Sequence, residues 1–163
     1  MTLAELNSAD RERFVEALGW IFENSPWVAE RAFASAPFYD LDELHRAMVA
    51  EVERAKPEEQ LALLRAHPDL GTRARISPAS QGEQAGAGLD RLTTDDFERL
   101  TRLNSAYRDK FGFPFLFAVK GSTKDDILRA LERRLKASPA EEFRVALEQV
   151  SRIARFRLED SLK

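Results

Sequence analysis

The sequence predicts an all-α fold, built as a single compact domain of about eight or nine helices over residues 1–163. Apolar residues recur three and four positions apart along most of the chain, and helix-capping residues precede these runs. The one β-like run, residues 113–119, is short, contains Pro114 and has no obvious pairing partner. With 163 residues and 44% apolar content, a single domain can bury roughly 70% of its unfolded surface.

The first half of the chain contains two helix starts that are marked by proline. Ser25-Pro26 combines a capping residue with proline at the first helical position, and Lys56-Pro57 opens a later helix in a similar way. The spacing of apolar residues predicts the other helix bounds in this half of the chain. We expect helices over residues 8–22, 26–35, 40–55 and 57–66.

The second half of the chain contains more capping signals. Ser80 and Glu83 fit a capping box, and the segment Ser138–Glu141 is a complete one. Thr94 and Thr123 each stand before acidic residues, which suit the first turn of a helix because of the helix dipole. We expect helices over residues 80–88, 94–110, 124–136 and 139–160.

Composition excludes several classes of function. The 25 basic and 28 acidic residues are interspersed and give a net charge of only −3, which argues against a nucleic-acid or membrane-binding surface. The absence of cysteine excludes disulfides, thiolate nucleophiles and cysteine-bound metals. Residues 1–10 do not resemble a signal peptide, and no apolar stretch approaches about 18 residues. We therefore expect a cytoplasmic protein.

Two connections interrupt the helical pattern, residues 67–80 and 112–121, and long connections in compact domains often carry function. His67 stands in the first of them, directly before Pro68, which ends the preceding helix and restricts His67 to extended backbone. Its imidazole can be a cation at a helix C-terminus or a catalytic group. The other histidine, His45, lies among apolar helix positions and is interpreted as a packing residue.

The helix predicted to begin at Ser80 contains Gly86 and Gly88 near its end. Each glycine costs about 1 kcal/mol relative to alanine inside a helix, so small residues here need a reason. Either another helix packs closely on this face, or a ligand lies over the N-terminus of the helix. The residues alone leave both explanations open.

The last predicted helix places an arginine among apolar residues. Phe143, Leu147, Val150, Ala154 and Arg157 are spaced by four and three residues and share one stripe. An arginine on a buried stripe needs a carboxylate or costs several kcal/mol, on the order of 3 to 5. The partner is either an anionic ligand, which we favour, or an acidic side chain; the arginine can also extend into water near the chain end.

Three motifs stand out when they are taken together: His67-Pro68-Asp69-Leu70, the run Ser80–Gln84, and Lys110-Phe111-Gly112-Phe113-Pro114-Phe115. In combination they resemble the family of 2-oxo-4-hydroxy-4-carboxy-5-ureidoimidazoline (OHCU) decarboxylases. The resemblance covers nearly the whole chain. Further matches follow in the family's order: Asn24-Ser25-Pro26, Ala87-Gly88-Leu89, Asn104, Tyr107, Arg133-Arg134-Leu135 and Ile153–Leu158.

The resemblance implies an all-helical homodimer that decarboxylates OHCU to (S)-allantoin in urate breakdown, with no metal or organic cofactor. His67 matches the family's proton donor, Arg157 its substrate-binding arginine, and Glu83 a catalytic residue that helps to orient the substrate. The expected substrate contacts are Pro68, Ser80, Gln81, Gly82, Gln84 and, through the backbone, Phe115, Leu116, Phe117, Ala118 and Val119.

The sequence departs from the family pattern in two places. The connection between Leu70 and Ser80 is a few residues shorter than in some animal members, which leaves the shape of this loop in doubt. Phe117 stands where many members have a smaller aliphatic residue, which would reshape the pocket slightly.

Two other functions fit parts of the pattern. A hydrolase of a small cyclic amide or ureide would use His67 to activate water, and it would open the ring instead of releasing carbon dioxide. A non-catalytic helical dimerisation module would use Gly86, Gly88 and the phenylalanine-rich loop as a packing surface. The second alternative predicts no pocket around His67 and Arg157.

Overall fold

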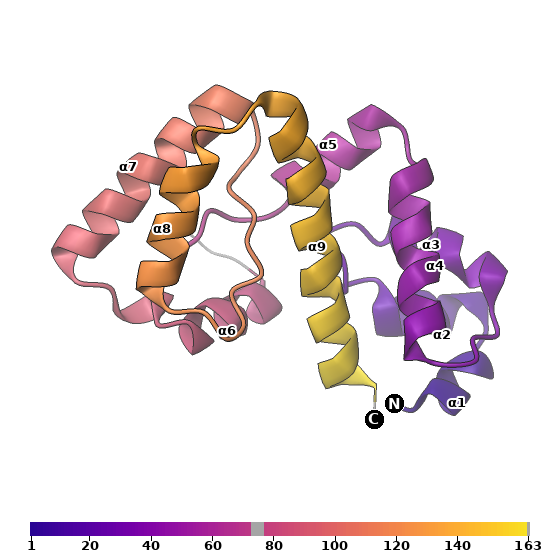
Figure 1. Ribbon diagram of the computed structural model, residues 1–163. Helices are drawn as coiled ribbons and strands as arrows, with labels where there is room; N and C mark the ends of the chain where they lie inside the picture. The colour runs from indigo at the N-terminus through magenta and orange to yellow at the C-terminus, as the bar shows by residue number, and fades with distance from the viewer. Residues whose placement is uncertain (73–76, 163) are drawn as a thin grey trace. The chain divides into compact units, whose positions relative to one another are not determined.

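The computed structural model describes residues 1–72 and 77–162 (Figure 1), and this part contains nine α-helices, two short 3-10 helices and no strand. The predicted all-α fold is confirmed. Contacts between Cα atoms divide the chain into two compact units, Met1–Ala66 with Val150–Lys163 (unit 1) and His67–Gln149 (unit 2). That the chain forms one domain stays a prediction. No helix in the described part is long and apolar enough to cross a membrane.

Unit 1 is built from the helices of the first 66 residues and the end of the last helix. Its core includes Phe14, whose ring lies 5.3 Å from that of Phe33 and 6.1 Å from that of Phe38. The helices are α1 (Leu3–Asn7), α2 (Arg11–Leu18), α3 (Trp27–Ala32), η1 (Phe33–Ser35), α4 (Leu41–Arg54), α5 (Pro57–Arg65) and the second part of α9 (Pro139–Ser161).

Unit 2 contains α6 (Pro78–Gly86), η2 (Leu89–Arg91), α7 (Thr94–Phe111), α8 (Lys124–Arg134) and the first part of α9. Helices α7 and α8 lie side by side (Figure 1), and the ion pairs Arg99–Glu132 and Lys124–Asp96 join them. The chain between these helices has no regular secondary structure, as predicted for residues 112–121.

The structure corrects the bounds of one predicted helix and the capping residue of two others. The predicted helix 8–22 is shorter, because the Asp10 side chain accepts from the Arg13 N–H to start α2, and the helix ends at Leu18. Helix α7 is capped by Thr93, not Thr94, and its side chain accepts from the Asp96 N–H. Ser25 does not cap α3, because its hydroxyl donates to the Glu23 carbonyl.

Helix α6 begins two residues earlier than predicted. Ser77 caps it through the Ser80 N–H, at 3.2 Å, and Pro78 occupies the first turn. Ser80 is therefore inside the helix and is not its cap. The other predicted starts are confirmed: Pro57 opens α5, Thr123 caps α8 and Ser138 accepts from the Glu141 N–H.

Candidate active site

His67 lies directly after α5, at the corner that the sequence predicts. The helix ends at Arg65, Ala66 is its C-cap, and Pro68 follows the histidine. The His67 residue is only 6% exposed. A largely buried imidazole on a corner stiffened by proline has little orientational freedom, which suits a group that must meet a substrate in one geometry.

The turn after His67 is tied to two helices. The Gly71 N–H donates to Gln84 Oε1 on α6 at 2.8 Å, and Asn104 Nδ2 on α7 donates to the Leu70 carbonyl at 2.9 Å. Gly71 has φ +73°, and a Cβ there would lie 2.5 Å from Leu100 Cδ2. This turn therefore requires glycine, and it fixes the segment that carries the histidine.

Helix α6 divides its predicted contact residues between two faces. Ser80 and Gln84 are buried and Glu83 is partly exposed, whereas Gln81 and Gly82 are exposed. The buried positions are four residues apart and so share one face. Since the amide oxygen of Gln84 is used by the Gly71 N–H, Gln84 has a structural role in addition to any substrate contact.

The glycines in and directly after α6 are not explained by close packing against other described residues. A Cβ on Gly82, Gly86 or Gly88 would meet no described atom within 4 Å. Of the two explanations that the sequence left open, close packing by another helix finds no support among the described residues. Gly88 has a simpler reason, because its φ of +80° lies in the left-handed region, where the chain leaves the helix.

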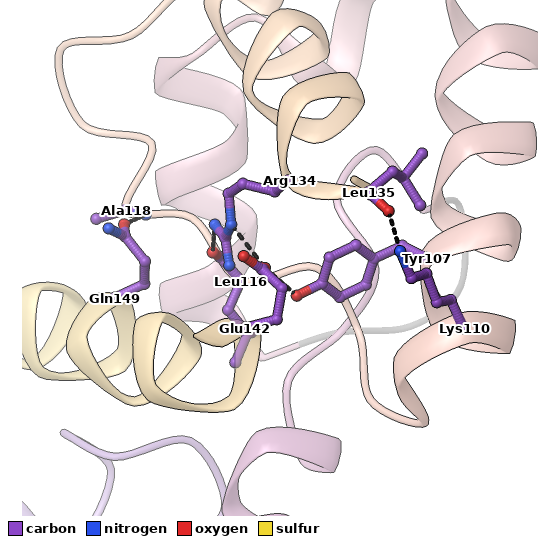
Figure 2. Close-up of polar contacts among 8 residues, drawn as sticks. All are labelled: Tyr107, Lys110, Leu116, Ala118, Arg134, Leu135, Glu142 and Gln149. Atoms are coloured by element: carbon purple, nitrogen blue, oxygen red, sulfur yellow. Dashed lines mark hydrogen bonds and ion pairs between the residues drawn. The ribbon is translucent and has the colours of Figure 1, made fainter. Parts of the chain in front are cut away.

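The segment Phe113–Val119 (the 113–119 segment) is irregular yet largely buried. Phe115 is fully buried, and only Phe117 is partly exposed. Figure 2 shows two side chains that hold its backbone: Arg134 Nη1 donates to the Leu116 carbonyl at 2.6 Å, and Gln149 Oε1 accepts from the Ala118 N–H at 2.9 Å.

Arg134 belongs to a buried cluster of three side chains, with Glu142 and Tyr107 (the Arg134 cluster; Figure 2). Arg134 Nε donates to Glu142 Oε1 at 2.8 Å, the two side chains are 8% and 2% exposed, and the Tyr107 hydroxyl donates to the same oxygen. Burial, together with this hydrogen bond, raises the pKa of the Tyr107 phenol far above its ordinary value of 10.0. Tyr107 therefore stays a protonated donor at any physiological pH.

The sequence analysis did not identify this cluster. Its signal was present, because Glu142 lies four, eight and twelve residues before Ala146, Val150 and Ala154, all of which are buried. The first part of the predicted apolar stripe is wrong. Phe143 and Leu147 are only partly buried, and the buried positions are Glu142 and Ala146, each one residue earlier in the sequence. A charged residue was not considered for a core position there.

Arg157 is buried in unit 1, as the stripe predicts for that position. Its Nη2 donates to Glu23 Oε2 at 2.7 Å, with the two side chains 4% and 3% exposed. Its Nη1 lies 3.3 Å from the carbonyls of Trp20 and Ile21. Of the alternatives that the sequence left open, the structure shows the acidic side chain. Glu23 was not identified from the sequence.

All the predicted site residues except Arg157 belong to unit 2. Residues 73–76, in the middle of the predicted connection 67–80, lie outside the described residues. In residues 1–72 and 77–162, no three imidazole or carboxylate side chains gather in a way that could hold a metal ion. The expected independence from metals and cofactors stays a prediction.

Comparison with known proteins decides the family. A family model described as OHCU decarboxylase matches residues 7–159. The chain belongs to the OHCU decarboxylase family. The resemblance found in the motifs around His67, Ser80 and Lys110 is thereby confirmed.

Two relatives named for this decarboxylase resemble the chain over almost their whole length. The 2-oxo-4-hydroxy-4-carboxy-5-ureidoimidazoline decarboxylase of Haloferax volcanii is 52% identical over 158 residues, which are 97% of this chain and 94% of the relative. The enzyme of the same name from Halalkalicoccus jeotgali is 49% identical over 160 residues, 98% of this chain and 91% of the relative. A crystal structure of (S)-allantoin synthase superposes with a TM-score of 0.82 at 37% identity, over 99% of this chain and 54% of the other.

Proposed function

We propose that the chain is a carboxy-lyase that converts OHCU to (S)-allantoin and carbon dioxide, the third step of urate degradation. The observation that carries this proposal is the family match over residues 7–159, supported by relatives of 52% and 49% identity that bear the name of this decarboxylase. The placement of a buried His67 on a proline-stiffened corner agrees with a role in catalysis.

The chemistry requires few groups from the protein. The substrate carries its carboxylate on the carbon that bears the hydroxyl, next to a C=N bond. When the bond to the carboxylate breaks, carbon dioxide leaves and the electron pair moves into the ring system. A proton then adds to the carbon that becomes the stereocentre of allantoin. We assign this proton to His67, which must deliver it to one face of the ring.

The remaining predicted residues orient the substrate in this proposal. Glu83 and Ser80 hold the ureido and ring polar atoms, and Arg157 supplies positive charge to an anionic or carbonyl oxygen. Pro68, the rest of the run to Gln84, and the backbone of residues 115–119 shape the contact surface. General acid catalysis of this kind contributes about 10²- to 10⁴-fold, and one donor to developing charge about 3 kcal/mol.

Product analysis tests the proposal against a hydrolase of a small cyclic amide or ureide. The substrate is generated in situ from urate with the two upstream enzymes of the pathway, and this protein is added. The expected result is carbon dioxide and allantoin released in a one-to-one ratio and faster than in the spontaneous decay of the substrate. A ring-opened product that retains its carboxylate would establish the hydrolase instead. A product mixture unchanged by the protein would favour the non-catalytic helical module.

We also propose that the protein acts as a homodimer in the cytoplasm, as the family resemblance implies. Light scattering coupled to size exclusion tests the first part, with a dimer of the 18.5 kDa chain expected. Fractionation of the source cells tests the second. A monomer with full activity would contradict the dimer as the functional form.

A further inference from the structure

The Arg134 cluster, Arg134 with Glu142 and Tyr107, has no role in the chemistry proposed above, yet all three side chains are buried. A buried ion pair is weak evidence for stability, because apolar residues of similar volume often replace one at no loss. In the described structure Arg134 Nη2 is also buried and has no hydrogen-bond partner, which adds a cost. The cluster therefore calls for a reason other than stability.

Arg134 and Tyr107 of the cluster contact the 113–119 segment. Besides the hydrogen bond from Arg134 Nη1 to the Leu116 carbonyl, the Arg134 guanidinium lies over the Phe115 ring, 4.5 Å from its centroid. The Tyr107 ring packs edge-on against Phe115 at 5.4 Å. Glu142 holds Arg134 by its Nε, so that the planar guanidinium has one orientation. One peptide and one ring of the segment are thus fixed together.

A second side chain fixes the segment two residues further on. Gln149, on the same helix as Glu142, accepts from the Ala118 N–H. In the part of the chain that the structure describes, the N–H groups of Leu116, Phe117 and Val119 make no hydrogen bond with other protein groups. No helix or sheet ladder holds the backbone of this segment, and the side-chain hydrogen bonds to it come from Arg134 and Gln149 (Figure 2).

We propose that Arg134, held by Glu142 and Tyr107, and Gln149 are positioning residues that fix the backbone of residues 115–119 for substrate binding in the decarboxylation. This inference rests on the proposed function, in which that backbone contacts the substrate. None of the four side chains is assigned contact with the reacting atoms. They act by keeping peptide groups in place, and a displacement of about 1 Å in a positioning element can cost roughly 100-fold in rate.

Two sets of variants test the proposal. Gln149→Leu removes one hydrogen bond while keeping side-chain volume. The triple variant Tyr107→Phe, Arg134→Met and Glu142→Leu removes the whole cluster without leaving a buried charge unpaired. Matched controls are Glu148→Gln and Arg133→Met, because both residues are exposed neighbours of the changed ones. For each variant, kcat, KM, the enantiomeric ratio of the allantoin and the urea unfolding midpoint are measured.

The proposal predicts a rise in KM of about fivefold for Gln149→Leu, the effect of one hydrogen bond, with an unfolding midpoint near that of the unchanged protein. For the triple variant it predicts a loss of at least tenfold in kcat/KM and a lower enantiomeric ratio of the allantoin than the unchanged protein gives. Both controls should match the unchanged protein. Folded variants that retain kcat/KM and enantiomeric ratio overturn the proposal; if the triple variant does not fold, Gln149→Leu decides.

Amide hydrogen exchange separates this inference from the proposed function. The Ala118 N–H should exchange slowly in the unchanged protein and faster in Gln149→Leu, whatever reaction the protein catalyses. If the unchanged protein does not decarboxylate OHCU, the proposed function fails and the positioning role fails with it, although the exchange result stands. If it does decarboxylate, and Gln149→Leu loses protection without any change in KM, only the positioning role is overturned.

Discussion

The buried pair of Arg157 and Glu23 allows structural and substrate-binding roles to be measured separately. The two side chains are 4% and 3% exposed and 2.7 Å apart. Removing one partner leaves the other charge buried and uncompensated, which costs about 3–5 kcal/mol. For a chain of 163 residues, that loss lowers Tm by roughly 10 °C. We expect this loss in Arg157→Met and in Glu23→Leu.

The double variant gives the decisive comparison. With both charges replaced by apolar side chains of similar size, most of the stability should return, because no buried charge is left unpaired. Urea unfolding of the four proteins measures the coupling between the two residues. The exposed pair Arg155 and Asp42 is the matched control, and its removal should leave the unfolding midpoint almost unchanged.

Activity of the same double variant tests the proposed substrate role of Arg157. If this arginine binds an anionic oxygen of the substrate, the stable double variant should still show a KM raised by at least tenfold. A double variant that recovers both stability and activity would refute that role and leave Arg157 a purely structural residue. If the stability loss of the double variant equals the sum of the losses of the two single variants, the two residues are not coupled, and the reasoning about the buried ion pair is refuted.

Three further changes have defined outcomes. Gly71→Ala should lower the free energy of unfolding by about 2–4 kcal/mol, because alanine is disfavoured at a positive φ and its Cβ would overlap Leu100. The Cβ of Gly82→Ala would meet no described atom within 4 Å, and this change should stabilise α6 by about 0.5–1 kcal/mol in the same urea titration. The hydrogen bond from Lys124 holds the pKa of the Asp96 carboxyl below its ordinary 3.8. The stability that this pair adds is therefore present above that pH and is lost as pH falls below it, and an unfolding midpoint that does not fall between pH 5 and pH 2.5 would contradict this. Dialysis against a chelator should leave kcat unchanged, and a loss that added metal restores would show that the reaction needs a metal ion.

The fold was predictable because its signals are local. The spacing of apolar residues and the prolines at positions 57 and 139 placed most helices within a few residues of their bounds. The errors arose where two caps compete within a few residues, as for Ser77 against Ser80 and Thr93 against Thr94. Choosing between them depends on how the helix packs, which a local pattern does not contain.

The candidate site was only partly predictable. His67 and Arg157 stood out because a histidine beside proline and an arginine on an apolar stripe are unusual, and both residues are buried. Glu23 was not predicted as the partner of Arg157, because the two residues are 134 positions apart in the sequence. Glu142 was not predicted as the partner of Tyr107 for the same reason, since 35 positions separate them. Pairing between distant residues is a tertiary property, and no local spacing reveals it.

The most direct test of the proposed mechanism is the circular dichroism of the allantoin formed from OHCU by the unchanged protein and by His67→Ala. The account predicts rapid formation of one enantiomer by the unchanged protein. With a folded His67→Ala variant, it predicts only the slow racemic product of spontaneous decay. A His67→Ala variant that forms one enantiomer at the normal rate would contradict the assignment of His67 as the proton donor.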